Sequence, residues 1–461
     1  MYHTDTSERW PLVRVKHLKR KHRSRVMTVH LYEHQQKVMN QIRPFNRCAV
    51  YVDMGGGKTF IGSEKMKELG KKVNLVICQK SKVADWVEHF REHYPELKVF
   101  DATSSKKDEK RALEYGFWMN YRNGGKVVPS VIVINYDLVW RRKEYLQLKD
   151  FTLMLDESSL IQNHGTKRTK YILRLQPANV ILLSGTPTSG RYERLWTQMH
   201  LLGWPISRKL YEQTYVIWDY IENWQTGYRI PVVKGYKNVD RLKRKMAEYG
   251  CVFMKSDEFG IDLPDQQDIT IRVKPSPDYK RFMKHRYLQM PDGTELVGDT
   301  SLTSRLYARM LCGQYNKEKL AAVKDLIEST EDRLIIFYNF TAEMEALRDL
   351  CINMLRPVSI VNGKTKDLRA YEKDPDSITL IQYQAGAYGL NLQKARRVIY
   401  FTLPESSELF EQSRKRIHRI GQDQKCFYYI PICQGSIETR ILQTLKERKD
   451  YTDALFKKDF E

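Results

Sequence analysis

The 461-residue sequence lacks the features of secreted, membrane-spanning and zinc-stabilised proteins. No apolar run approaches the ~20 residues that a membrane-spanning helix needs. The N-terminus carries Asp5, Glu8 and Arg9 and no apolar core, so we expect no signal peptide. The seven cysteines are scattered, odd in number and without a C-x-x-C pair, which argues against a disulfide framework and a structural zinc. We therefore expect a reducing, cytoplasmic setting.

Acidic residues are also scarce, because 56 Asp and Glu stand against 78 Lys and Arg and leave a net charge of +22. Such a surplus favours a polyanionic partner, nucleic acid above all; the alternative is a basic protein with no nucleic-acid role. Residues 14–25 hold seven Lys or Arg within an N-terminal tail, 1–26. This run is either solvated or in contact with phosphates. Gln substitutions at Lys19, Arg20, Lys21 and Arg23 that left DNA affinity and its salt dependence unchanged would exclude the contact.

Apolar segments alternate with amphipathic ones from Leu31 onward, which is typical of parallel sheets covered by helices. The first series of expected strands is Cys48–Val52, Val73–Cys78, Val131–Ile134, Phe151–Leu155 and Val180–Leu183, with helices such as Val83–Glu92 and Lys107–Met119 between them. The second series is Leu334–Phe337, Val358–Val361, Ile378–Ile381, Val398–Phe401 and Phe427–Ile432. We predict an α/β fold of two lobes with a small helical protrusion between them. The expected boundaries are 27–203 for lobe 1, 204–275 for the protrusion and linker, and 276–461 for lobe 2.

A glycine-rich segment, Asp53-Met54-Gly55-Gly56-Gly57-Lys58-Thr59, joins the first expected strand to a helix-like segment, Phe60–Leu69. Glycines let backbone N–H groups turn inward around a phosphate, and the helix N-terminus adds positive charge. Lys58 would reach the β- and γ-phosphates of a nucleotide, and the Thr59 hydroxyl would hold Mg²⁺. Val52 replaces the first glycine of the general G-x-x-x-x-G-K-[ST] pattern. A chance Gly-rich turn is therefore the alternative on these residues alone.

Two carboxylates, Asp156 and Glu157, close the expected strand Phe151–Leu155, at the sheet edge where ligands of α/β proteins bind. Beside a phosphate loop, Asp156 would hold Mg²⁺ and Glu157 would position and deprotonate the attacking water. Alone, the pair would be a surface turn. Ser184-Gly185-Thr186-Pro187 likewise follows the strand Val180–Leu183, where small hydroxyl residues can sense a γ-phosphate or couple two lobes, or form an ordinary turn.

Two arginines near the C-terminus, Arg416 and Arg419, are three positions apart, so a helix would present both on one face. Guanidinium groups aimed at a γ-phosphate neutralise the charge that develops during its transfer. The alternative is a solvated basic helix end.

In this order the motifs resemble superfamily 2 helicases and, within them, the Snf2-like ATPases. Leu31 to Gln35 resembles the adenine-reading glutamine motif, and Asp53 to Thr59 resembles motif I. The later motifs resembled are II at Asp156-Glu157-Ser158-Ser159, III at Ser184 to Pro187, V at Gln384 to Leu392, and VI at Arg416-Ile417-His418-Arg419-Ile420-Gly421-Gln422. The last is the most specific match. Compact motors of this kind are similar to bacterial and bacteriophage forms.

The resemblance implies two RecA-like lobes that close on ATP and Mg²⁺, the first lobe being the ATP-binding one and the second the helicase C-terminal one. The implied ATP-binding residues are Gln35, Gly55, Gly56, Gly57, Lys58, Thr59 and Gly389, with Thr59 and Asp156 at the metal. The implied catalytic residues are Glu157, Lys58, Arg416 and Arg419, and the coupling residues are Ser184, Gly185, Thr186 and Asn391. The implied nucleic-acid contacts are Ser81, Lys82, Asn135, Tyr136, Gly363, Lys364 and Thr365.

The implied function is an ATP-driven DNA translocase or helicase that moves on duplex, forked or branched DNA in replication or recombination. It would act as a monomer, away from membranes, in a bacterial cytoplasm or an infected cell, with low sequence specificity because its contacts are mainly to phosphates. Ser159 stands where the family often has histidine, which puts the coupling of ATP to movement in question. The alternatives are a strand-separating helicase on DNA or RNA, and a nucleotide-gated binding module without turnover.

Overall fold

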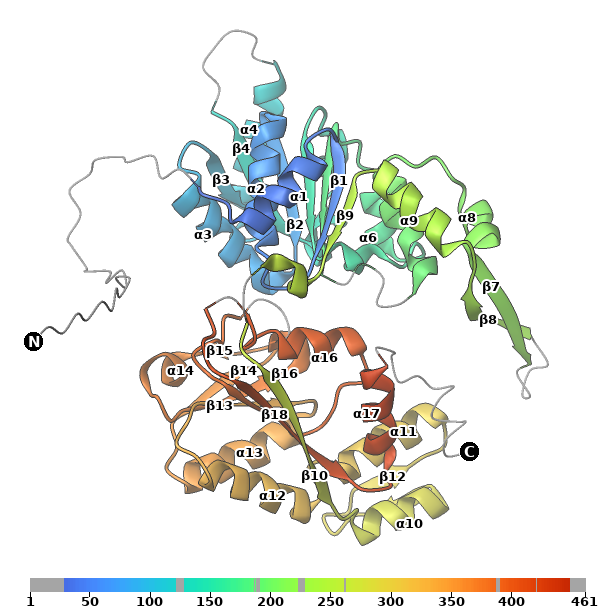
Figure 1. Cartoon of the computed structure of the whole chain (residues 1–461), viewed down its shortest axis with the longest axis vertical. Helices are drawn as coiled ribbons and strands as arrows, with labels where there is room; N and C mark the ends of the chain where they lie inside the picture. Colours follow the sequence, from blue (N-terminus) through green and yellow to red (C-terminus); the bar gives the residue numbers. More distant parts are fainter. Residues whose placement is uncertain are drawn as a thin grey trace, which may run out of the picture.

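The computed structural model describes residues 29–121, 128–185, 187, 191–222, 229–260, 263–386, 390–419 and 421–447. The basic run 14–25 lies outside these residues. The chain forms two lobes, each built on a seven-stranded sheet (Figure 1). No helix among the described residues is long and apolar enough to cross a membrane.

Lobe 1 is a wholly parallel sheet in the order β3-β4-β2-β5-β6-β1-β9. Its strands are β1 (Arg47–Val52), β2 (Val73–Cys78), β3 (Lys98–Asp101), β4 (Ser130–Asn135), β5 (Thr152–Asp156), β6 (Asn179–Leu183) and β9 (Cys251–Met254). Its helices include α1 (Glu33–Ile42), α2 (Lys58–Leu69), α3 (Val83–His93), α4 (Lys106–Tyr121), α5 (Tyr136–Val139), α6 (Lys167–Ile172) and α7 (Trp196–Leu201). Alternate residues of β1 enter two different cores, one on each face of the sheet. Burial on both faces explains why these strands are continuous apolar runs.

Lobe 2 repeats this plan in the order β10-β18-β17-β13-β16-β14-β15, with only the short β14–β15 pair antiparallel in its sheet. Its strands are β10 (Gln266–Val273), β13 (Leu334–Tyr338), β14 (Val358–Val361), β15 (Lys366–Asp367), β16 (Ile378–Gln382), β17 (Arg397–Tyr400) and β18 (Cys426–Cys433). Its helices include α10 (Pro277–His285), α11 (Ser301–Cys312), α12 (Lys317–Glu328), α13 (Thr341–Asn353), α14 (Arg369–Lys373), α15 (Tyr383–Gly386), α16 (Ser407–Arg414) and α17 (Ile437–Lys446). A small hairpin, β11 (Tyr287–Gln289) with β12 (Glu295–Val297), precedes α11.

The two-lobed parallel α/β architecture expected from the sequence is confirmed. Each expected strand agrees with the observed one to within a residue at both ends. The strands that the sequence did not predict lie at the sheet edges, where they are short or polar. β10, for example, begins with Gln266, Gln267 and Asp268 and is exposed along most of its length, so it has no apolar run to detect.

The connecting region, 204–275, differs from the expectation in two respects. It holds α8 (Arg208–Tyr215) and α9 (Val239–Glu248), but its projecting part is an antiparallel hairpin of β7 (Val216–Glu222) and β8 (Arg229–Tyr236) (Figure 1). Its end also contributes β9 to the first sheet and β10 to the second. The passage between the lobes is therefore short, running from Met254 to Gln266.

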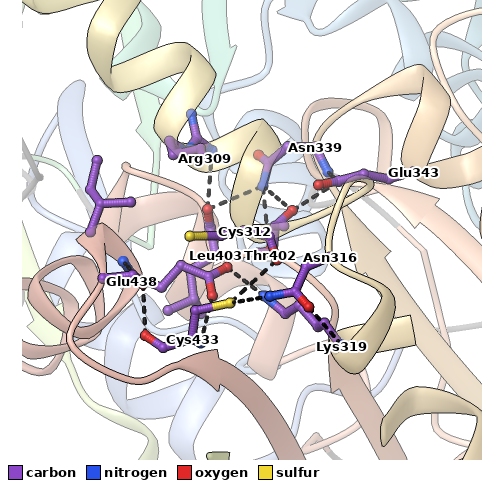
Figure 2. A network of polar contacts seen from close by, with 12 residues as sticks. Arg309, Cys312, Asn316, Lys319, Asn339, Glu343, Thr402, Leu403, Cys433 and Glu438 are labelled. Carbon is purple, nitrogen blue, oxygen red and sulfur yellow. Dashed lines mark hydrogen bonds and ion pairs between the residues drawn. The ribbon is translucent and has the colours of Figure 1, made fainter. Parts of the chain in front are cut away.

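Lobe 2 encloses a buried polar network that fastens α11, α12 and α17 to the end of β18 (Figure 2). Lys319, which has no exposed surface, donates to Glu438, whose other oxygen accepts the backbone N–H of Cys433 at 3.0 Å. Asn316 donates to the Cys433 sulfur at 3.0 Å. The side-chain atoms of Cys312, Cys433 and Glu438 that could bind a metal ion lie within 4.8 Å of one another. Because Lys319 already neutralises the Glu438 carboxylate, we interpret the cluster as part of the packing of lobe 2 and not as a metal site.

Candidate active site between the lobes

The glycine-rich loop lies between β1 and α2, as the sequence predicts, and its conformation requires glycine. Gly55 and Gly57 have φ of 89° and 76°, the left-handed region. A Cβ on Gly57 would lie 1.9 Å from Gln35 Nε2, and a Cβ on Gly56 would lie 2.6 Å from Phe259 Cζ. The loop is thus held between two side chains that leave no room for any other residue.

Gln35 reaches the loop from the start of α1. Its Oε1 accepts the backbone N–H of Tyr32 at 2.9 Å, and its Nε2 donates to the Gly56 carbonyl at 3.4 Å. On the other side, Phe259 stacks on His34 with ring centroids 4.8 Å apart. Sequence reasoning missed Phe259, which belongs to a 3₁₀ turn, Ser256–Phe259, in a region without hydrophobic periodicity.

Lys58 opens α2 and points back into the loop. Its Nζ donates to the Val52 carbonyl at 2.8 Å. Burial lowers the pKa of Lys58 below its usual range, although Glu157 and Asp156 favour the charged form. Thr59 follows it and lines the same cleft. The lysine is therefore held at the strand end, where the charges of Glu157 and Asp156 favour its protonated form.

Asp156 ends β5 and Glu157 follows it in the left-handed region, with φ of 51°. The indole N–H of Trp86 donates to Asp156 Oδ2 at 2.8 Å, which fixes that carboxylate. Glu157 Oε2 is buried and has no hydrogen-bond partner among the described residues. Burial raises the pKa of Glu157 to about 7, against the opposing effect of Lys58. Asp156 is thus oriented, while Glu157 is poised to take up a proton near neutral pH.

Arg416 and Arg419 do not lie on one helix face, which corrects the sequence expectation, because α16 ends at Arg414. Gln422 holds the following turns by donating to the carbonyls of Gln393, Ala395 and Ile417 at 3.0–3.3 Å. These tertiary bonds replace a helical continuation. Arg419 donates to Asn391 Oδ1, and burial lowers its pKa.

A cleft of ≈ 560 Å³ joins the two sets of residues. Lobe 1 contributes Gly55, Gly57, Lys58, Thr59, Asp156 and Glu157, and lobe 2 contributes Asn391, Lys415, Arg416 and Arg419. The residues expected to be catalytic therefore meet in one cavity although they come from different lobes. Inward-turning glycines, a buried lysine and an oriented carboxylate fit a nucleotide phosphate with Mg²⁺, which Thr59 and Asp156 would hold.

Of the residues expected to couple the lobes, Ser184 and Gly185 lie next to the phosphate loop at the end of β6. Ser184 is buried at the end of β6, and a Cβ on Gly185 would lie 3.4 Å from Lys58 Nζ. Thr186 lies outside the described residues, as does Gly389, which was expected to bind ATP. Ser159, the departure from the family pattern, donates to Glu408 Oε1 of lobe 2 at 3.3 Å.

A second cavity of ≈ 530 Å³ also lies between the lobes. Among the residues expected to touch nucleic acid, it is lined by Ser81, Tyr136, Gly363, Lys364 and Thr365. The sequence missed further polar and basic lining residues: Lys80, Arg168, Asn362 and Lys366. Tyr136 also donates to the backbone carbonyl of Asp156 at 2.8 Å, so a residue of this cavity is hydrogen-bonded to a residue that lines the first cleft.

Lys82 and Asn135, also expected to touch nucleic acid, do not line this second cavity. Lys82 lines the first cleft and pairs with Asp85 at 3.0 Å. Asn135 is buried as the last residue of β4. Both therefore remain predictions as nucleic-acid contacts.

Comparison with family models gives two matches. The model of the SNF2-related domain matches residues 15–331, and that of the helicase conserved C-terminal domain matches residues 318–421. The two models overlap at residues 318–331, which form α12 of lobe 2 and the turn before β13.

Three relatives illustrate the similarity. The chain is 23% identical to the probable ATP-dependent DNA helicase CHR12 of Arabidopsis thaliana, over 81% of this chain and 36% of the relative. It is 22% identical to the DNA annealing helicase and endonuclease ZRANB3 of Mus musculus, over 89% and 39%, and 23% identical to the uncharacterized ATP-dependent helicase YqhH of Bacillus subtilis, over 91% and 77%. The chain thus spans well under half of the first two relatives. A solved SWI2/SNF2 ATPase core of Sulfolobus solfataricus in complex with dsDNA aligns over 93% of this chain and 92% of its own, with 20% identity and a TM-score of 0.42.

Proposed function

The chain belongs to the SNF2-related family, and from this premise we propose that it is a DNA-dependent ATPase that translocates on duplex, forked or branched DNA. One observation carries the proposal. Lys58 and Glu157 of lobe 1 and Arg416 and Arg419 of lobe 2 line the same ≈ 560 Å³ cleft, so the site is complete only when the lobes are together.

Within the cleft, Glu157 would accept the proton of the attacking water, since its Oε2 has no other described partner and its pKa of about 7 suits a base near neutral pH. Lys58, Arg416 and Arg419 would neutralise the charge that develops on the transferred phosphoryl group. Mg²⁺ would supply further charge neutralisation at the phosphates. Because the arginines come from lobe 2, binding energy at the phosphates favours lobe closure.

DNA is the partner that the second cavity favours. Its lining contains Lys80 and Arg168 of lobe 1 with Lys364 and Lys366 of lobe 2, and the whole chain carries a net charge of +22. Contacts from both lobes on one backbone would change their spacing when the lobes close. That change is what would convert hydrolysis into a step along DNA, without base-specific contacts.

A forked or branched substrate, in replication or recombination, is the finer part of the proposal. It is supported by the mouse relative, whose name is that of a DNA annealing helicase. Strand separation is the second candidate function, because the motor residues do not distinguish separation from translocation. A nucleotide-gated binding module without turnover is the third, and the replaced histidine at Ser159 is the observation that favours it.

The decisive experiment measures the steady-state ATPase rate without nucleic acid and with single-stranded, duplex and forked DNA and RNA, alongside Glu157→Gln. Strong stimulation by duplex or forked DNA, lost in the variant, supports the translocase. Displacement of a third strand from a triplex without unwinding of a tailed duplex then separates translocation from strand separation. A rate that no polymer changes refutes the motor, and bound nucleotide without turnover identifies the binding module.

A further inference from the structure

An ion pair crosses the cleft at a point that the expected catalytic residues do not include. Lys415 Nζ of lobe 2 lies 2.8 Å from Asp53 Oδ2, in the first residue of the phosphate loop, and the two side chains are only 21% and 25% exposed. We propose that Asp53 and Lys415 are a positioning pair that seats the arginine-bearing turn of lobe 2 on the phosphate loop of lobe 1.

Asp53 makes hydrogen bonds to several segments of lobe 1. Its backbone N–H donates to the Met254 carbonyl at 2.9 Å, its carboxylate accepts the N–H of Ser256 at 3.2 Å, and its carbonyl lies 3.4 Å from Lys58 Nζ. Met254 and Ser256 stand where the chain leaves lobe 1 for lobe 2. Asp53 therefore holds both the start of the covalent passage between the lobes and, through Lys415, the non-covalent contact across the cleft.

Lys415 is placed to control the arginines. It is the C-cap of α16, where its N–H donates to the Glu411 carbonyl, and Arg416 is the next residue. Arg419 also approaches the loop closely, because a Cβ placed on Gly55 would lie 3.5 Å from the Cβ of Arg419. The turn 415–419 thus rests on the phosphate loop at both ends. An anchor one residue away limits how far Arg416 can move from the loop, and misplacement by about 1 Å can cost ~100-fold in rate.

The charge of Asp53 persists at neutral pH. Burial opposes it, but Lys415 and the Ser256 N–H hold the pKa of this carboxyl below its usual range. Lys415 therefore faces a fixed anion of the loop in the nucleotide-free protein. The competing possibility is that Lys415 leaves Asp53 and binds the phosphates directly, and the experiment separates the two.

The test compares Lys415→Met, Asp53→Asn and the double variant, with Lys415→Arg as the conservative rescue. Lys324→Met is the matched control, since it removes a lobe 2 lysine and its 3.5 Å pair with Glu328 on α12. We expect each single variant to lower kcat roughly 5- to 20-fold with KM for ATP changed less than about 2-fold, because the arginines act in the transition state. The double variant should be no worse than the worse single variant, and Lys415→Arg should recover most of kcat.

A distance measurement supplies a readout that does not need turnover. All seven native cysteines are described and buried, so spin labels can be placed at Lys110→Cys in lobe 1 and Ile352→Cys in lobe 2. The lobe-to-lobe distance distribution should broaden in Lys415→Met and stay unchanged in Lys324→Met. The inference on rate rests on the ATPase part of the proposed function, but this distance does not. An inactive wild-type protein whose distance still depends on Lys415 would refute the function and leave the pair standing.

Two results would overturn the proposal. Unchanged kcat and unchanged distances in Lys415→Met would show that the pair positions nothing. Multiplicative losses in the double variant, with KM raised by Lys415→Met even when Asp53 is Asn, would show that Lys415 binds phosphate directly. Lys415→Met leaves the phosphate loop intact, so the first of these results can be read even if Asp53→Asn fails to fold.

Discussion

Replacement of Glu157 by Gln should stop turnover and also stabilise the nucleotide-free protein at alkaline pH. The pKa of Glu157 is raised by burial from an ordinary 4.5 to about 7. Between these values the unfolded chain releases a proton that the folded chain retains, so stability falls as pH rises from 4.5 to 7. At about 1.4 kcal/mol for each pH unit, the penalty at pH 8 is roughly 3 kcal/mol. Gln keeps the shape of the side chain and carries no such penalty.

Urea unfolding at pH 5 and pH 8, without nucleotide or divalent ions, measures the difference. We expect Glu157→Gln to raise the free energy of unfolding by about 3 kcal/mol at pH 8 and by less than about 1 kcal/mol at pH 5. Glu328→Gln, on the exposed face of α12, is the control and should change little at either pH. Equal gains at both pH values, or a loss at pH 8, would refute the idea that Glu157 is held in an unfavourable ionised state.

Further expectations follow from the same geometry. Gly57→Ala should abolish ATP binding, read by titration with a fluorescent nucleotide, because the new Cβ would clash within a loop whose φ is 76°. Lys364→Gln should weaken DNA binding and reduce the slope of log affinity against log salt by about 1, whereas Lys82→Gln should leave the slope unchanged because Lys82 lies in the other cleft. Lys319→Met should destabilise lobe 2 by about 3–5 kcal/mol in thermal unfolding, since it leaves a buried carboxylate uncompensated.

Much of the fold was accessible from the sequence for a simple reason. Strands buried on both faces are continuous apolar runs, and the carboxyl ends of parallel strands meet at one edge of the sheet. Residues at or just after the ends of such strands, like Asp156 at the end of β5, could therefore be placed together from the sequence alone.

The remainder depended on contacts between residues far apart in the chain. Phe259 packs on Gly56 without any local periodicity, and the edge strands β9 and β10 are too short or too polar to be recognised. Helical spacing placed Arg416 and Arg419 on one face, but Gln422 bonds to three carbonyls and holds that segment in turns. In this segment, hydrogen bonds to residues distant in the chain outweigh the local preference for a helix.

Ser159, which stands where the family often has histidine, still makes a contact between the lobes. Ser159 lies two residues after Glu157 and donates to Glu408 of lobe 2, which also accepts a hydrogen bond from the side chain of Gln412 at 3.1 Å. Glu408 is in turn one of the charges that raise the pKa of Glu157. A serine hydroxyl is shorter than an imidazole, so this contact requires α16 of lobe 2 to lie close to Ser159. We therefore expect protonation of Glu157 and closure of the cleft to depend on the same carboxylate, Glu408.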